Sequence, residues 1–387
     1  MPNFFKKHYI NDILFYEPKI FNEKVALSCR LFPFTRQKLQ LLAVMDIIVG
    51  EEEIKKRLKK YAAIVSGAER AEQNLEVLKS LTKKETITPE TLKNYSGWGG
   101  LKDAISNPEI YKELKSQLSD DEIDSIKRTL SSAYYTPELL VKFMWTALLR
   151  MGFRYGNILE PAVGTGIFFD HMPPIIRQWS DLDAVEIDRI TCNILVNKHP
   201  DIHLTCAGFE KVYFGKKRYD LIISNPPYGK EIINDMFNPD LSHLIIHHWF
   251  VAKCARILKE KGIIAMVLPQ FFLDNVKDHA RDIINDAGVG MIAAYRLPDN
   301  LFSNAKVTVD IVFLQKAETN IKWLNTGKIT IGNDTKPLNE YFINNPEHIL
   351  GELQVVPMYN RTGITCKEKG NLRDHLYNAC LKITRLT

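Results

Sequence analysis

Two hydrophobic patterns divide this chain. Residues 1 to about 120 include E-E-E-I-K-K-R-L-K-K at 51–60, where three glutamates each stand four residues ahead of a lysine or arginine. That spacing favours an exposed helix, and we expect the whole region to be mainly helical. From about 131 to 316, short apolar runs alternate with helical stretches. This alternation predicts a mostly parallel sheet with helices on both faces.

The expected elements can be placed along the chain. The apolar runs predict strands near 157–160, 182–187, 202–206, 220–224, 263–268, 290–296 and 308–315. Helices are expected near 137–151, 166–178, 188–198, 240–260 and 276–287. The last 70 or so residues show turns, a strand signal near 328–331 and a helix near 371–385. We therefore expect a helical N-terminal region (1–120), a Rossmann-like α/β domain (121–318) and a C-terminal extension (319–387).

Composition narrows the class of protein. The 387 residues are 45% hydrophobic and 25% charged, as in ordinary globular proteins, and the net charge of +5 permits an acidic partner without requiring one. The six cysteines form no C-x-x-C pair, which favours reduced thiols over a disulfide framework or a zinc site. No targeting segment or membrane-length apolar run is visible. We expect a soluble cytoplasmic protein without a metal.

The string Asn225-Pro226-Pro227-Tyr228 follows the apolar run Leu221–Ile223. Neither proline has an N–H to donate, and both have a nearly fixed φ, so the neighbouring carbonyls are held in set directions. An amide, outward carbonyls and an aromatic ring together suit a planar substrate that carries an amino group. The alternative is a proline-rich turn that closes a strand.

A second motif, E-P-A-V-G-T-G at 160–166, joins a strand to a helix. Gly164 and Gly166 allow the backbone to approach a ligand closely. The motif is not a dinucleotide fingerprint, because residue 169 is Phe, and no G-K-[ST] follows as in a phosphate loop. Glu160 would repel a pyrophosphate but suits a ligand with an ammonium group.

The next strands add candidate contacts to a nucleoside. Glu186 ends the second strand about 20 residues after the glycine turn, where an acidic side chain accepts both ribose hydroxyls. Asp188 is expected to cap the following helix. Phe209 is either a contact to an adenine ring or a core residue. Thr136, in A-Y-Y-T-P-E, is expected to cap a helix whose free N–H groups also suit a carboxylate. A nucleoside with an amino-acid tail and no phosphate, S-adenosylmethionine, fits this set.

Taken in order, Y-Y-T-P, E-P-A-V-G-T-G, V-E-I-D, G-F-E and N-P-P-Y resemble the motifs of the gamma-class DNA adenine-N6 methyltransferases. That resemblance spans about 131–316 and implies a class I methyltransferase fold. Two further strings, Y-S-G-W-G-G-L at 95–101 and N-E-Y-F-I-N-N-P-E-H-I-L-G at 339–351, resemble the methylase module of large helicase–methyltransferase proteins of phages and mobile elements. From the residues alone, Trp98 between glycines is a packing plug or part of a pocket rim, and packing is favoured.

The resemblance implies S-adenosylmethionine as cofactor and DNA as substrate, with a base flipped out of the duplex. It implies these cofactor contacts: Tyr135, Thr136 and Pro137 at the methionine end, Glu160 at its ammonium, Ala162, Gly164 and Gly166 along the cofactor, Glu186 and Ile187 at the ribose, and Phe209 at the adenine. Asn225, Pro226, Pro227 and Tyr228 would take the target base, with Phe302 stacking on its other side.

Two departures from the family pattern matter. The aspartate that often takes the cofactor's adenine amino group has only Gly208 or Glu210 as a counterpart here. Only about 70 residues follow Lys316, too few for a large recognition domain. A specificity or helicase partner protein is therefore an expected option.

Other readings stay open at this point. Lys216, Lys217 and Arg218 are candidate phosphate contacts, although loop lysines are usually just solvated. The same tetrapeptide serves protein glutamine-N5 methyltransferases and RNA amino-methyltransferases. A non-catalytic DNA-binding, anti-restriction factor is a further alternative to a restriction-modification enzyme.

Overall fold

The computed structural model describes residues 5–10, 13–18, 67–80, 92, 94–99, 101–129, 136–276, 279–302, 307–358 and 361–386. The chain divides into two compact units, Met1–Glu69 and Arg70–Thr387. In the first, strands β1 (Phe5–Ile10) and β2 (Ile13–Pro18) form an antiparallel hairpin that a mainly helical prediction did not include. The segment 51–60, on which that prediction rested, lies outside the described residues.

The second unit begins with a group of helices. Residues 70–80 are the second-unit part of a helix that spans 67–80, and they are followed by α5 (Lys102–Ile105), α6 (Pro108–Gln117) and α7 (Asp120–Thr129). Asn107 caps α6 by accepting a hydrogen bond from the Glu109 N–H, and Pro108 occupies the first turn, where its missing N–H costs nothing. The apolar faces of these helices share one buried cluster with Trp98.

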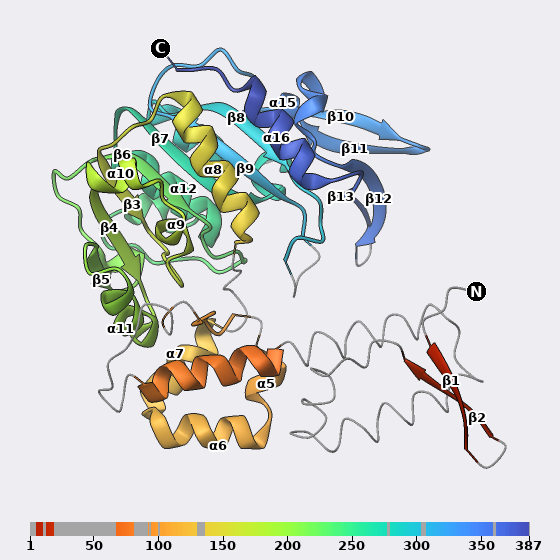
Figure 1. The fold of residues 1–387 in the computed structure, drawn as a ribbon. Helices are drawn as coiled ribbons and strands as arrows, with labels where there is room; N and C mark the ends of the chain where they lie inside the picture. The colour runs from red at the N-terminus through yellow and green to blue at the C-terminus, as the bar shows by residue number, and fades with distance from the viewer. Residues whose placement is uncertain are drawn as a thin grey trace. The chain divides into compact units, whose positions relative to one another are not determined.

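The rest of the unit is built on one seven-stranded sheet (Figure 1). Its strands are β3 (Asn157–Glu160), β4 (Asp181–Glu186), β5 (His203–Cys206), β6 (Tyr219–Ser224), β7 (Leu258–Pro269), β8 (Gly290–Arg296) and β9 (Val309–Gln315). They lie in the order β5-β4-β3-β6-β7-β9-β8, and only β9 runs antiparallel to its neighbours. This is the strand order of a class I methyltransferase, so the predicted fold class is confirmed and all seven predicted strands are present.

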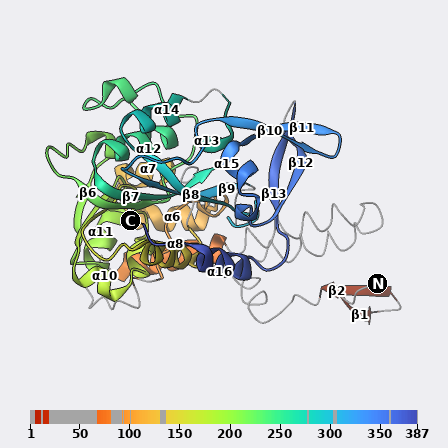
Figure 2. The ribbon, with the colours of Figure 1, turned by 90° about the horizontal axis from the view of Figure 1, so that it is seen from above.

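Helices cover both faces of the sheet. Figure 2 shows α8 (Glu138–Met151) and α16 (Leu372–Lys382) together on one face, and α12 (Ile246–Arg256) and α14 (His279–Asp286) on the other. Each face has its own buried apolar cluster. The sheet is thus the shared wall of two cores, which explains why its central strands are continuous apolar runs.

Two predicted helices differ from the observed ones. The helix expected at 166–178 is split into α9 (Ile167–Asp170) and α10 (Pro174–Gln178), because Pro173 and Pro174 cannot continue the backbone ladder of a helix. The helix expected at 240–260 is shorter. A 3₁₀ turn, η3 (Pro239–Leu241), precedes α12, and β7 already begins at Leu258.

The expectation of reduced thiols is wrong for one pair of cysteines. Cys192 in α11 (Arg189–Lys198) and Cys206 at the end of β5 form a disulfide. The β4–α11–β5 crossover brings their Cα atoms to 6.0 Å, a separation that suits a bridge and that sequence spacing alone does not reveal. Cys254, Cys366 and Cys380 are free and buried.

The C-terminal extension holds more strands than expected. The signal near 328–331 corresponds to β10 (Thr326–Ile331), which pairs with β11 (Asp334–Asn339). After α15 (Glu340–Asn344) and a 3₁₀ turn at Pro346–His348, a second hairpin follows, made of β12 (Glu352–Met358) and β13 (Arg361–Lys367). The predicted helix at 371–385 is α16.

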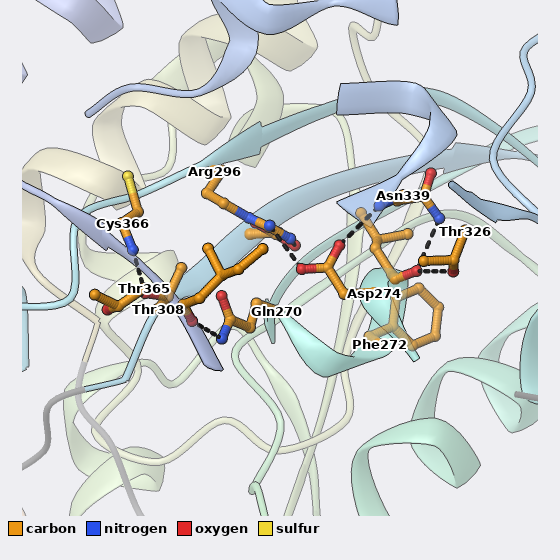
Figure 3. A network of polar contacts seen from close by, with 12 residues as sticks. Gln270, Phe272, Asp274, Arg296, Thr308, Thr326, Asn339, Thr365 and Cys366 are labelled. Atoms are coloured by element: carbon orange, nitrogen blue, oxygen red, sulfur yellow. Dashed lines mark hydrogen bonds and ion pairs between the residues drawn. The ribbon is translucent and has the colours of Figure 1, made fainter. Parts of the chain in front are cut away.

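One buried arginine joins this extension to the sheet (Figure 3). The Arg296 guanidinium donates to Asp310 through Nε (2.8 Å) and Nη2 (2.9 Å), and to Asp274 at the end of α13 (Phe271–Asp274) through Nη1 (2.7 Å). The other oxygen of Asp274 accepts from the backbone N–H of Asn339 at 3.0 Å. Arg296 and Asp310 are fully buried, and the Arg296 guanidinium also lies over the Phe342 ring at 4.4 Å. The charges are thus paired with one another rather than with water.

Replacing Arg296 with methionine should lower the free energy of unfolding by about 3–5 kcal/mol, because two buried carboxylates lose their only cation in this network. Arg256→Met is the matched control, since Arg256 pairs with the mostly exposed Asp240 and should cost at most about 1 kcal/mol. Urea unfolding followed by circular dichroism measures both. Equal losses in the two variants would contradict a central role for Arg296.

Candidate active site

A cavity of about 260 Å³ lies at the carboxyl ends of β3, β4 and β6. This is the edge at which ligands bind in open α/β sheets. Nine of the residues expected to bind cofactor or base line it: Thr136, Glu160, Ala162, Gly164, Glu186, Ile187, Phe209, Asn225 and Pro227. Residues from five separate sequence motifs therefore meet around one space.

The glycine turn after β3 has the backbone geometry that glycine permits. Gly164 and Gly166 both have positive φ, 52° and 79°. A Cβ on Gly166 would lie 2.9 Å from Leu195 Cδ2 and 3.0 Å from His199 Nε2, so this turn packs directly on α11. Gly166 does not line the cavity; it shapes the turn that does.

Glu160 is the last residue of β3 and is 1% exposed, yet its Oε2 has no hydrogen-bond partner among the described residues. Burial raises the pKa of Glu160 well above its ordinary value, and the nearby charges of Asp170 and Glu186 raise it further. Lys198 opposes this shift only in part. The cavity wall thus contains a buried acidic group whose neutral form is favoured in the ligand-free protein.

Glu186 occupies the matching position at the end of β4. Its Oε2 accepts from the Gly164 N–H at 2.8 Å and its Oε1 from the Asp188 N–H at 2.9 Å, so the carboxylate is held by both flanking turns. Burial raises the pKa of Glu186 to about 7, although these two N–H groups favour its charged form. The second strand therefore also ends in a fixed carboxylate on the cavity.

The start of α8 differs from expectation. Thr136 was expected to cap this helix, but Pro137 is the N-cap residue and no side chain makes a capping hydrogen bond. Thr136 is instead a buried residue, 3% exposed, that lines the cavity. Tyr135 lies outside the described residues, and Pro137 does not line the cavity.

Asp188 follows β4, and Phe209 follows β5. Asp188 caps α11 as predicted, accepting from the Thr191 N–H at 2.9 Å. Phe209 lines the cavity, but its ring is 3% exposed and stacks on Phe250 at 5.2 Å with an interplanar angle of 20°. Lys253 Nζ lies 4.8 Å from the centre of the same ring. Phe209 is thus both part of the core and part of the wall.

The N-P-P-Y string leaves β6 at the cavity. Asn225 is half-buried and lines it together with Pro227, whereas Pro226 is buried. The Tyr228 hydroxyl donates to Asn225 Oδ1 and also lies 3.0 Å from the Val267 carbonyl oxygen. This contact fixes the direction of the Asn225 amide. The sequence alone did not predict a hydrogen bond between these two side chains.

The expected stacking pair does not border the cavity. Phe302 is a buried member of the core beneath α8, 6% exposed, and Tyr228 packs against that core. Two tryptophans that were not assigned to the site, Trp98 and Trp249, do line the cavity. Each is 1% exposed, and each has an indole N–H that finds no acceptor in the described ranges. For Trp98, the flanking glycines were the one signal in the sequence that pointed to a pocket rim.

The basic cluster lies elsewhere. Lys216, Lys217 and Arg218 immediately precede β6, and the Arg218 carbonyl accepts from the side chain of Asn157, the first residue of β3. They are therefore at the amino ends of these strands, whereas the cavity is at the carboxyl ends. Lys217 forms an ion pair with Asp183. The structure does not bring this cluster to the cavity.

Two negative observations concern the described residues only. Within them, no group of three or more His, Cys, Asp or Glu side chains is arranged to hold a metal ion. Likewise, none of the helices in the described ranges is long and apolar enough to cross a bilayer.

Comparison with known proteins adds three relatives. "Defense against restriction protein B" of Escherichia phage P1 is 22% identical over 250 residues, which cover 62% of this chain and 10% of that protein. "Type II methyltransferase M.CvrRI" of Paramecium bursaria Chlorella virus XZ-6E is 26% identical over 213 residues, covering 53% of this chain and 54% of that one. The chain thus spans about half or less of these relatives. A solved type I restriction-modification methyltransferase subunit from Streptococcus thermophilus has a TM-score of 0.42 at 14% identity, covering 79% of this chain and 77% of that one.

A protein-family model also matches the chain. The model of the family "N-6 DNA Methylase" matches residues 124–348, which include every lining residue named above except Trp98. More than half of the chain lies within the match. This chain belongs to the N-6 DNA methylase family.

Proposed function

We propose that the protein transfers the methyl group of S-adenosylmethionine to the N6 amino group of adenine in DNA, with the base flipped out of the duplex. The observation that carries this proposal is that one cavity is lined both by the expected cofactor residues, such as Glu160 and Glu186, and by Asn225. Methyl transfer requires the donor and the acceptor nitrogen in contact, and a shared cavity permits this.

The residues present fit the proposed cofactor. Glu160 offers a buried carboxylate oxygen without a hydrogen-bond partner among the described residues, and the α-ammonium of a methionine tail would supply a partner for it. Glu186 is held by two backbone N–H groups, and each of its oxygens keeps acceptor capacity for a ribose hydroxyl. Thr136 lines the same cavity just before α8, and its hydroxyl would donate to the methionine carboxylate.

Asn225 and Pro226 would act on the target base. The N6 nitrogen of adenine is a weak nucleophile because its lone pair is delocalised into the ring. Asn225 Oδ1 and the Pro226 carbonyl would each accept one N6 hydrogen, which favours a tetrahedral nitrogen with its lone pair available. When bound, the cofactor supplies the activated methyl group. The protein's contribution is positioning and electrostatic stabilisation.

Base flipping would cost roughly a few kcal/mol, and stacking on Tyr228 and Phe302 would recover about 1–3 kcal/mol for each aromatic contact. Both rings contact the core beneath α8 in this structure. Stacking therefore requires them to turn toward the cavity when the base enters. The Asn225 amide oxygen has a second acceptor site, so it can receive an N6 hydrogen while the Tyr228 hydroxyl still donates to it.

The relatives extend beyond the part that this chain matches, which supports a further proposal about partners. Target recognition would come from a partner protein with a specificity or helicase function. RNA, a protein glutamine and a purely DNA-binding role remain alternatives, and the assay below separates them.

Asn225→Ala should reduce methyl transfer by roughly 100-fold or more, because the residue that holds the N6 hydrogens is lost. The dissociation constant for S-adenosylhomocysteine should stay nearly unchanged. The assay incubates the protein with labelled cofactor and unmethylated DNA and then identifies the methylated nucleoside after digestion. Parallel incubations with RNA and with a glutamine peptide test the alternatives. Label in either of those alone, or full activity in the variant, would refute the assignment.

Tyr228→Phe separates the hydroxyl from the ring. The variant keeps the stacking surface but loses the hydrogen bond to Asn225. If that bond orients the amide, kcat should fall about 5- to 10-fold with little change in KM for DNA. An unchanged kcat would mean that only the ring matters.

Glu160→Gln should have opposite effects on stability and on binding. In the ligand-free protein the raised pKa of Glu160 contributes stability at low pH that is lost as the pH rises through the folded-state value. The variant should therefore be more stable than the wild type at about pH 8, by about 1–3 kcal/mol, and similar to it at about pH 5.

The dissociation constant of the Glu160→Gln variant for S-adenosylhomocysteine should rise at least about tenfold, because the carboxylate that would pair with the ligand's ammonium group is lost. Thermal unfolding and calorimetry measure the two effects. The exposed Glu260→Gln variant is the control and should change neither. A destabilised Glu160→Gln protein that still binds the cofactor product would contradict the role of Glu160.

A further inference from the structure

The glycine-flanked Trp98 lies on the cavity, outside the sheet and its covering helices. Its side chain is 1% exposed, and none of the residues that the structure describes accepts a hydrogen bond from its indole N–H. A buried tryptophan normally finds an acceptor, and Trp145 in α8 does so, donating to the Phe168 carbonyl at 2.9 Å. Trp98 therefore carries an unmet hydrogen-bonding demand at the edge of the proposed cofactor site.

The loop that carries Trp98 is held firmly by the helix at 67–80. The fully buried Asn74 donates to the Gly97 carbonyl at 2.8 Å and accepts from the Ser96 N–H at 2.9 Å. Arg70 donates to the carbonyls of Ser96, Gly97 and Gly99 at 3.2–3.4 Å. Gly97 has φ 68°, a conformation that favours glycine. Arg70 and Asn74 thus bind the backbone on both sides of Trp98 and hold the loop that presents its ring.

The same group of helices is attached to the strand end that carries Glu186. Tyr95 Oη lies 3.0 Å from Thr191 Oγ1, and Ser125 in α7 donates to Asp188 at 2.8 Å. Asp188 and Thr191 are the cap and first turn of α11, immediately after Glu186. Ile190 and Ile194 of α11 belong to the apolar cluster that contains Trp98. Trp98 is therefore placed on the α11 side of the cavity, where the ribose would lie.

We propose that Trp98 is a cofactor-binding residue, whose indole N–H donates to an oxygen or ring nitrogen of the bound nucleoside. The helical segments 70–80 and 102–129, with the loop that carries Trp98, then form one wall of the cofactor site, and Ser125, which also lines the cavity, belongs to that wall. This inference rests on the proposed cofactor, since the acceptor is an atom of that ligand. It assigns a ligand-binding role to a motif that packing alone would otherwise explain.

Trp98→Phe tests the proposal, because phenylalanine keeps an aromatic ring and removes only the N–H donor and part of the ring system. The dissociation constant for S-adenosylhomocysteine, measured by calorimetry, should rise about 5- to 10-fold. The ligand-free unfolding temperature should also fall, because part of a fully buried ring is removed. Trp145→Phe is the matched control. It likewise shortens a buried ring and also breaks a satisfied hydrogen bond, so its unfolding temperature should fall at least as far while its affinity stays at the wild-type value.

The outcomes separate the two proposals. If the wild-type protein does not bind S-adenosylhomocysteine, the proposed function fails and this inference fails with it. If the wild type binds and Trp98→Phe binds equally well, only the role of Trp98 is overturned. Should the variant not fold, hydrogen–deuterium exchange of residues 94–99 in the wild type replaces it. Protection on adding S-adenosylhomocysteine supports the contact, and unchanged exchange overturns it.

Discussion

Two buried carboxylates, Glu160 and Glu186, stand at the ends of adjacent strands and impose the main electrostatic constraint on this protein. Burial raises the pKa of both groups, and their mutual repulsion adds to the shift of Glu160. A folded chain tolerates such groups when a ligand or a hydrogen-bond network compensates them. Glu186 has its network in the two adjoining turns, whereas one oxygen of Glu160 has no hydrogen-bond partner within the part of the chain that the structure describes. The raised pKa of Glu160 therefore favours its neutral form in the ligand-free protein.

The rest of the site is arranged around that edge of the sheet. The glycine turn brings the backbone close to the carboxylates, and the N-P-P-Y string places Asn225 on the same cavity from the neighbouring strand. Parallel pairing of β3, β4 and β6 is what brings these distant segments together. The helices before the sheet contribute Trp98 from outside this arrangement. The cavity is therefore lined by more of the chain than the sheet domain alone.

Sequence reasoning located what depends on local pattern. The seven strands, the Asp188 cap and the positions of Glu160, Glu186 and Asn225 follow from apolar runs and from the residues that end them. It did not locate what depends on distant contacts. The disulfide between Cys192 and Cys206, the burial of Phe302 and the placement of Lys216–Arg218 at the amino ends of strands all arise from how the crossovers fold back. The long helix expected at 166–178 was lost to two prolines that were visible in the sequence.

Arg296 has a consequence for how the molecule comes apart. Its guanidinium ties β8 to β9 and, through Asp274, reaches the backbone of Asn339 in β11. Loss of β11 from its native position would uncover one end of a desolvated charge network at the β9–β8 edge of the sheet. The hairpins after residue 316 and the sheet are accordingly expected to melt as a single cooperative unit. A boundary drawn there by sequence pattern would then not coincide with a thermodynamic one.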